Sequence, residues 1–191
     1  MIILGVDPGT LITGYGVIEV RNGKRTMLAC GCVKNDGSRS MPLRLKAIYE
    51  GLAAVIDRYQ PDEFAIETAF YGKNAQSALK IGHARGVSIL AAVNRQLPTS
   101  EYAPREVKKA VVGNGSASKH QVRFMVKSIL AGANVPTTLD VSDALAVAIC
   151  HSFRLRNGTT MKRHPAKRSG SRKNSWGEFL RSHPERILRR P

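Results

Sequence analysis

The sequence predicts an α/β fold built on a five-stranded mixed sheet, in which three antiparallel strands are followed by two parallel ones. Three apolar, strand-like runs lie within the first 33 residues and are joined by short turns. Helical patterns then alternate with two further short strands up to residue 155. Short turns favour antiparallel neighbours, whereas helices inserted between strands favour a parallel arrangement, so we expect helices to flank the sheet.

The first three strands are expected at residues 2–6, 13–20 and 26–33. Turn-forming residues separate them: Pro8 and Gly9 follow the first strand, and Asn22 and Gly23 lie between the second and third. Runs of apolar and β-branched residues bounded by such turns are typical of a meander.

A helix is expected to begin at Ser40, with Pro42 near its first turn, and to end before Pro61. Its apolar face would consist of Leu45, Ile48, Leu52, Val55 and Ile56. A short buried strand should follow at residues 64–67. Asn74 can then cap a long helix over residues 75–94. The remaining elements are a strand at 99–102 and helices near 105–112, 118–131 and 141–155.

The charge balance indicates a polyanionic partner. The chain has 191 residues, with 30 Lys and Arg against 14 Asp and Glu, for a net charge of +16. A chain this basic is typical of nucleic-acid binding, although a basic surface without a specific role or an attraction to anionic lipid would share this composition. No apolar stretch is long enough to span a membrane, and residues 2–6 lack the basic flank of a signal peptide, so we expect a cytoplasmic protein.

The distribution of charge divides the chain into a domain at residues 1–153 and a tail at 154–191. The tail carries 12 Lys and Arg against Glu178 and Glu185, for a net charge of +10. Because it has few apolar residues, we expect it to be largely disordered and to add nonspecific affinity for DNA. A short helix around Trp176 that docks on a partner is the alternative. Three cysteines, Cys30, Cys32 and Cys150, are expected to be buried hydrophobes.

Four acidic side chains stand where a buried core would not need them. Asp7 follows an apolar strand, Glu67 ends another, and Asp140 and Asp143 lie three residues apart at the start of an apolar helix. Four carboxylates near one sheet edge would repel each other unless cations held them together. Hard oxygen ligands suit Mg²⁺ or Mn²⁺, and two such ions can promote phosphoryl transfer.

Each of these acids has a structural alternative. Asp7 could form an ordinary turn, and Glu67 could pair with an arginine. Asp140 could cap its helix, with Asp143 a favourable charge in the first turn. His151 lies two turns beyond Asp143 on the same predicted helix, and we expect it to have a surface or packing role rather than to bind a metal. Support of the acidic site by His151 is the lesser alternative.

Six motifs occur in order within residues 1–153. They are residues 3–10 (ILGVDPGT), 13–17 (TGYGV), 64–67 (FAIE), 73–79 (KNAQSAL), 112–116 (VGNGS) and 140–146 (DVSDALA). Together they resemble the RuvC-type Holliday junction endonucleases of bacteria. This resemblance implies an RNase H-like fold, a homodimer, and Mg²⁺-dependent paired nicks in a four-way junction that leave 5′-phosphate and 3′-hydroxyl ends. It also suggests a branch-migration motor as a partner.

The resemblance implies roles for particular residues. Asp7, Glu67, Asp140 and Asp143 would be the catalytic carboxylates and would hold two Mg²⁺ per subunit, with Mn²⁺ able to substitute. Phe70 would stack on an unpaired base, Lys108 and Lys119 would contact phosphates near the cut, and the helix after Asn74 would pair two subunits. From the residues alone, Phe70 could equally anchor its loop, and Lys119 could simply be solvated.

Three other functions share some of these features. Residues 7–10 (DPGT) followed by 14–16 (GYG) also resemble the phosphate loop of actin-like ATPases and sugar kinases, but those need a second such domain, and 153 residues hold only one. A noncatalytic DNA-binding protein would bind without regard to Mg²⁺ or branching. A nuclease acting on RNA or RNA/DNA hybrids would share the fold and the carboxylates. The motif at 73–79 and the Phe70 loop favour the junction enzyme over it.

Overall fold

The computed structural model describes residues 1–68, 75–130 and 138–156. The strands in this part of the chain are β1 (Ile2–Asp7), β2 (Ile12–Arg21), β3 (Lys24–Lys34), β4 (Glu63–Glu67) and β5 (Thr99–Tyr102). The helices are α1 (Met41–Tyr59), α2 (Ala75–Val93), α3 (Pro104–Val112), α4 (Lys119–Ile129) and α5 (Leu139–Arg156).

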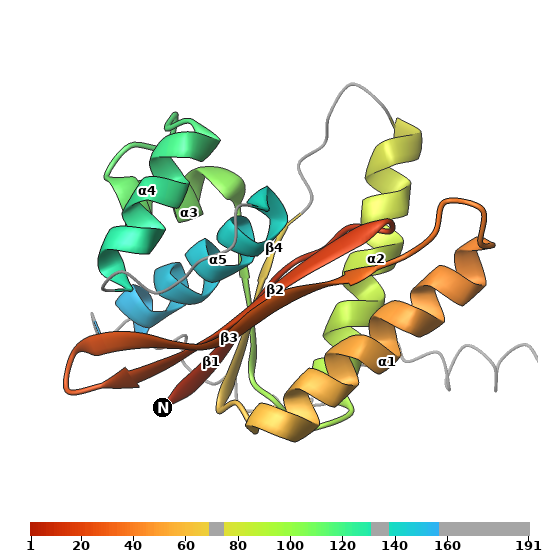
Figure 1. Ribbon diagram of the computed structural model, residues 1–191, viewed down its shortest axis with the longest axis horizontal. Helices are drawn as coiled ribbons and strands as arrows, with labels where there is room; N and C mark the ends of the chain where they lie inside the picture. Colours follow the sequence, from red (N-terminus) through yellow and green to blue (C-terminus); the bar gives the residue numbers. More distant parts are fainter. Residues whose placement is uncertain (69–74, 131–137, 157–191) are drawn as a thin grey trace, which may run out of the picture. The chain divides into compact units, whose positions relative to one another are not determined.

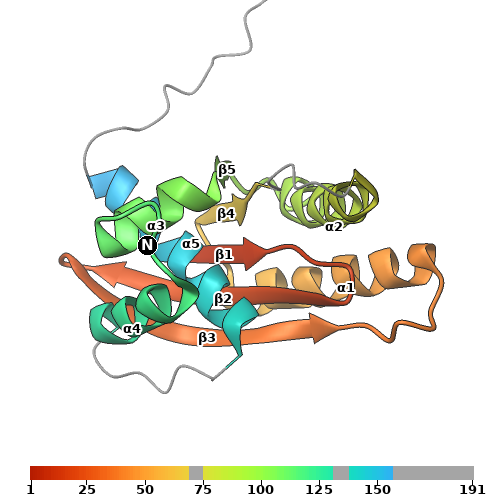
Figure 2. The same cartoon turned by 90° about the horizontal axis from the view of Figure 1, so that it is seen from above.

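The five strands form one mixed sheet in the order β3-β2-β1-β4-β5 (Figure 2). β1 pairs antiparallel with β2, and β2 pairs antiparallel with β3. β4 then runs parallel to β1, and β5 runs parallel to β4. The predicted sheet, with three antiparallel strands followed by two parallel ones, is therefore confirmed.

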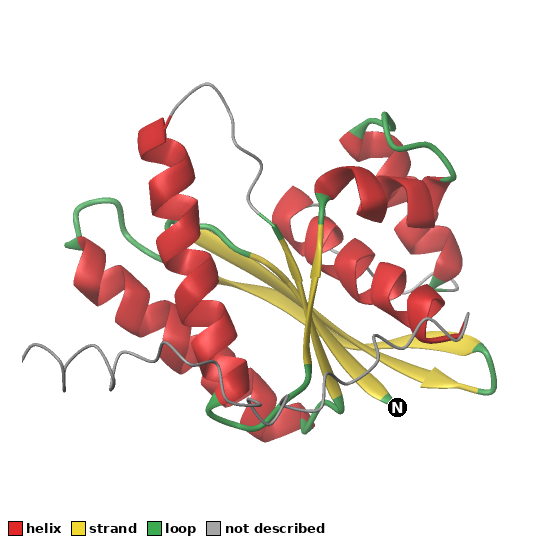
Figure 3. Ribbon diagram, turned by 180° about the vertical axis from the view of Figure 1, so that it is seen from behind, coloured by secondary structure: helices red, strands yellow, loops and turns green. Residues whose placement is uncertain are grey.

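Helices cover both faces of the sheet. Because successive strand residues point to opposite faces, neighbouring residues of one strand contact different groups of helices. Ile3 of β1 packs in a buried cluster with residues of α3, α4 and α5. Leu4 and Val6 of the same strand pack instead in a second cluster, with residues of α1 and α2. Figures 1 and 3 show these two groups of helices on opposite sides of the sheet.

α5 lies directly against the sheet because two strand glycines leave room for its backbone. A Cβ atom on Gly5 of β1 would lie 2.3 Å from the carbonyl oxygen of Ala144. A Cβ atom on Gly14 of β2 would lie 2.2 Å from the carbonyl oxygen of Asp140. Since Gly14 of β2 is the register partner of Asp7 on the adjacent strand β1, the first turn of α5 lies next to the end of β1.

Three expectations need adjustment at the level of single residues. α5 begins at Leu139, so Asp140 lies in the first turn of the helix and is not its cap. Cys150 is buried as predicted, but Cys30 and Cys32 on β3 are only half-buried, because β3 is an edge strand. α5 also continues to Arg156, into the first residues of the predicted tail.

Several other predictions lie outside the described residues. Asn74, the predicted cap of α2, is one of them, and the tail from residue 157 onward is another. Within the described ranges, none of the helices is both long and apolar enough to cross a membrane.

Candidate active site

Two of the four acidic residues are brought together by the parallel pairing of β1 and β4. Asp7 is the last residue of β1, and Glu67 is the last residue of β4. Val6 lies opposite Ile66 in the register, so the two acids follow at equivalent positions. Ile3 and Ala65 pack toward α5, and strand alternation places Asp7 and Glu67 on that same face.

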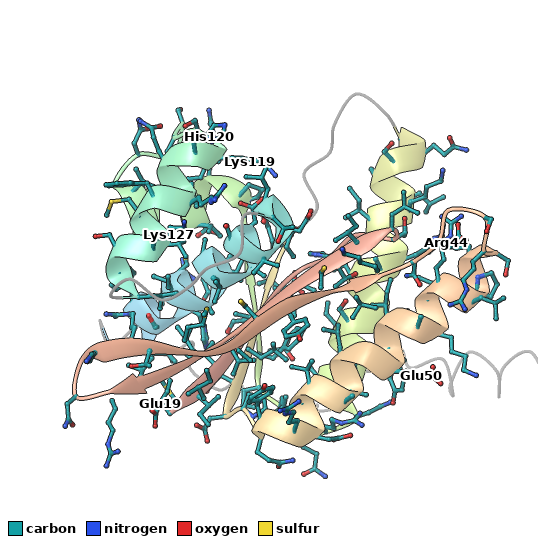
Figure 4. All side chains as sticks on the ribbon, in the orientation of Figure 1. Glu19, Arg44, Glu50, Lys119, His120 and Lys127 are labelled. Atoms are coloured by element: carbon teal, nitrogen blue, oxygen red, sulfur yellow. The ribbon has the colours of Figure 1, made fainter. Side chains whose placement is uncertain are left out.

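α5 and α4 supply the third acid and its cation. Asp143 lies in the second turn of α5, and Lys119 is the first residue of α4. Lys119 Nζ donates a hydrogen bond to Asp143 Oδ2 at 2.7 Å. α4 begins at this position because the Ser118 and Gln121 side chains each bond the other's backbone N–H in a capping box. Figure 4 shows Lys119 at this end of α4.

These side chains line a cavity of about 210 Å³ on the α5 face of the sheet. The cavity contains five of the side chains that the sequence predicts for the site, and four others that form its apolar walls. The five are Asp7, Glu67, Lys108, Lys119 and Asp143. The walls are Pro104, Val107, Val122 and Ala146.

The cavity makes negative charge costly. Burial, followed by the charges of Asp143 and Asp140, raises the pKa of Asp7 to about 7, although Lys119 opposes this rise. Burial and the charges of Asp7 and Asp143 raise the pKa of Glu67 to about 8, against the opposing effect of Lys119 and Lys108. The cations that lower the pKa of Glu67 are thus two lysines, in place of the arginine that the structural alternative predicts.

Lys119 is held in the charged state by the same arrangement. Its hydrogen bond to Asp143 raises the pKa of its ammonium group, and the charges of Asp7 and Asp140 act in the same direction. Partial burial acts against this rise. Lys119 therefore supplies positive charge beside the carboxylates of this cavity.

The donor chemistry of the cavity fits a hard divalent cation. Carboxylate oxygens are the ligands that such ions prefer, and a divalent cation would oppose the burial and mutual repulsion that raise the pKa values of Asp7 and Glu67. As the side chains stand, the described residues contain no group of three or more His, Cys, Asp or Glu that could hold a metal ion. Asp143 is bonded to Lys119 instead.

Asp140 is set apart from this group, and Phe70 cannot be placed relative to it. Asp140 is not among the residues that line the cavity, and its backbone lies over Gly14. Its charge nevertheless contributes to the raised pKa of Asp7, so the two carboxylates interact. Phe70 lies outside the described residues.

Sequence reasoning missed the apolar walls. Val107 and Val122 are ordinary core-facing positions of α3 and α4, so their spacing signals packing and carries no chemical signal. The only hint of their role in the sequence is their position: Val107 precedes Lys108, and Val122 lies in the helix that starts at Lys119.

Comparison with known proteins identifies the family. The family model described as crossover junction endodeoxyribonuclease RuvC matches residues 3–151. A protein of that name from Desulforamulus reducens is 51% identical over 152 residues, which cover 80% of this chain and 93% of that protein. Another, from Pelodictyon phaeoclathratiforme, is 47% identical over 192 residues, covering 99% of this chain and 98% of that one.

A solved structure agrees in three dimensions. Thermus thermophilus RuvC in complex with a Holliday junction substrate matches with a TM-score of 0.78 and 34% identity. The match covers 83% of this chain and 97% of that one, and it confirms the RNase H-like architecture implied by the motifs. The chain belongs to the RuvC family of crossover junction endodeoxyribonucleases.

Proposed function

We propose that this protein resolves Holliday junctions in DNA recombination and repair, by making paired symmetric nicks that leave 5′-phosphate and 3′-hydroxyl ends. The observation that carries the proposal is the cavity in which Asp7, Glu67 and Asp143 meet Lys108 and Lys119, in a chain of the RuvC family. The Thermus thermophilus relative, solved with a Holliday junction substrate, supports the choice of DNA over RNA hybrids.

Asp7, Glu67, Asp140 and Asp143 would together hold the divalent metal. We propose two Mg²⁺ per subunit, as the resemblance to the family implies. Carboxylate donors suit Mg²⁺ and allow Mn²⁺ to substitute. When bound, such ions activate water and neutralise charge on the leaving oxygen of a phosphodiester. Asp143 Oδ2 accepts the hydrogen bond from the Lys119 ammonium, so Asp143 would hold the metal through its other oxygen or would have to give up this bond.

Three other side chains would hold the DNA. Lys108 and Lys119 lie at the cavity, where they can bond the phosphates on either side of the scissile bond. Such contacts position the backbone without reading its sequence. Phe70 would stack on an unpaired base near the junction centre, an interaction that tolerates any base.

The reaction on two strands calls for two copies of the site. A four-way junction is roughly two-fold symmetric, so a two-fold homodimer would present one cavity to each of two opposed strands. α2 is the pairing helix that we propose, and it carries exposed Leu79, Leu90 and Val93. Exposed apolar side chains that gather on one face of a helix are typical of an interface. We further propose a cytoplasmic protein that works with a branch-migration motor.

The test compares the wild type with Asp7→Asn on a synthetic four-way junction and a linear duplex of matched sequence, with and without Mg²⁺. Both proteins should bind the junction, because the substitution leaves the basic surface intact. Only the wild type should make paired nicks, only in the junction and only with metal. Binding without cutting by either protein, in Mg²⁺ or Mn²⁺, would favour a noncatalytic DNA-binding protein instead.

A further inference from the structure

A buried polar pair joins α5 to the end of β5 behind the cavity. The Tyr102 hydroxyl and His151 Nδ1 lie 2.7 Å apart, and each residue is only 2% exposed. Their rings meet edge to face, with centroids 5.7 Å apart and an angle of 65° between their planes. Neither residue lines the cavity, and neither has a part in the function proposed above.

The protonation states of the two residues and a nearby carboxylate determine the direction of this hydrogen bond. Burial raises the pKa of Tyr102 to about 12, so its hydroxyl keeps its proton. Burial and the nearby Arg154 lower the pKa of His151 to about 4, so the ring is neutral. A neutral ring carries its proton on one of the two nitrogens, and the Glu63 carboxylate, whose Oε2 lies 3.5 Å from Nε2, favours the proton on Nε2. In that tautomer Nδ1 is the acceptor and Tyr102 donates to it. At that distance the carboxylate orients the ring by its charge, without a hydrogen bond.

A second connection strengthens the same joint, by which we mean the contact of Tyr102 on β5 with His151 on α5. The Arg154 guanidinium lies 5.3 Å from the centroid of the Tyr102 ring, and it bonds Glu106 at 3.0 Å. Glu106 in turn accepts a hydrogen bond from the Ala103 backbone N–H, which is the cap position of α3. The last turns of α5 are thus attached both to the end of β5 and to the first turn of α3.

Tyr102 and His151 are each connected, through the backbone, to residues that line the cavity. On one side, the Tyr102 carbonyl accepts a hydrogen bond from Thr68 N–H at 2.8 Å, one residue after Glu67. α3, which starts two residues after Tyr102, carries Lys108 into the cavity. On the other side, His151 follows Asp143 by eight residues of one helix, about 12 Å along its axis.

We propose that Tyr102 and His151 are positioning residues, whose hydrogen bond sets where Asp143 of α5 stands relative to Glu67 and Lys108. Asp143 and His151 lie on one helix, and rigid secondary elements can carry coupling between sites, so a change in the position of His151 would move Asp143. The inference rests on the proposed nuclease function, because it concerns the geometry of that cavity.

The experiment measures single-turnover cleavage of a four-way junction, junction affinity and the melting temperature for each variant. Tyr102→Phe removes one oxygen, and His151→Leu removes the acceptor. Both should cut roughly 10-fold more slowly at an unchanged Kd, because small misplacements at a reacting centre have effects of this order. His151→Asn puts an oxygen near the place of Nδ1 and should recover most of the rate.

Val55→Ala is the control for stability, because Val55 packs from α1 in the cluster on the opposite face of the sheet. It should lower the melting temperature without slowing cleavage. Wild-type cleavage by Tyr102→Phe, or rates that follow melting temperature in all variants including Val55→Ala, would overturn the positioning role. If the wild type itself fails to cut the junction, the proposed function falls, and the inference falls with it.

Discussion

Gly14→Ala should impair cleavage through the position of α5. An added Cβ would lie 2.2 Å from the Asp140 carbonyl oxygen and 3.3 Å from the Asp140 Cβ. Contacts under 3.0 Å are essentially never seen for a real Cβ, so the first turn of α5 must move away by about 1 Å. Asp140 and Asp143 lie on this turn and the next, and both would move with it.

A displacement of this size at a reacting centre costs on the order of 100-fold in rate. Overpacking of this kind also costs about 1–3 kcal/mol of stability, which a folded domain can tolerate. The assay is single-turnover cleavage of a labelled four-way junction, at a temperature well below the melting transition of the variant. Junction binding should stay close to that of the wild type, because the lysines of α3 and α4 are not on the displaced turn.

Gly37→Ala is the matched control. Gly37 lies in the loop before α1, and the nearest atom to an added Cβ there is Leu11 Cδ2 at 4.0 Å. This variant should cut like the wild type. A Gly14→Ala protein that cuts as fast as Gly37→Ala would refute the reasoning, because it would show that the place of the first turn of α5 does not set the rate.

Other perturbations of the cavity have directions that follow from its charges. Lys119→Met removes a cation that lowers the pKa of both Asp7 and Glu67, so the acid limb of the pH–rate profile should move to higher pH; an unmoved limb would contradict this. In the metal-free protein, the folded state favours protonated Asp7 and Glu67, so the stability that these protons confer is fully present below pH 4 and is lost as pH rises through about 7 to 8. The melting temperature of the metal-free protein should therefore fall between about pH 4 and pH 8. Glu67→Gln should make the melting temperature depend less on pH in this interval. Truncation after Arg156 removes ten Lys and Arg and two acids. DNA affinity, measured in titrations from low to high salt, should become weaker and less dependent on salt, while the cleavage rate of bound junction stays unchanged.

The order and type of the elements could be predicted from the sequence because each has a strong local pattern. Turn residues separate the first three strands, and regular apolar spacing marks α1. The meeting of Asp7 with Glu67 could also be anticipated, since both end apolar strands. What the sequence lacks is the register, and it is the pairing of Val6 with Ile66 that places the two acids at equivalent positions.

Long-range side-chain pairs could not be predicted in the same way. Tyr102 ends a short strand, and His151 falls within an apolar helix, so each looks like a core residue when it is considered alone. Their contact spans 49 positions and depends on how α5 crosses the sheet. The hydrogen bond between Lys119 and Asp143 is also long-range, since these residues lie 24 positions apart on different helices.

The charge arrangement explains why binding and cutting should have different requirements. The chain as a whole carries a net charge of +16, which attracts DNA at a distance without the help of a metal. Within the cavity, however, Asp7, Glu67 and Asp143 would repel a phosphate once all three are ionised, and Lys108 and Lys119 then offset only part of that charge. The remaining positive charge has to arrive with a divalent cation, which stabilises the ionised carboxylates as well as the phosphate. Metal should therefore be dispensable for capture of the junction and indispensable for cleavage.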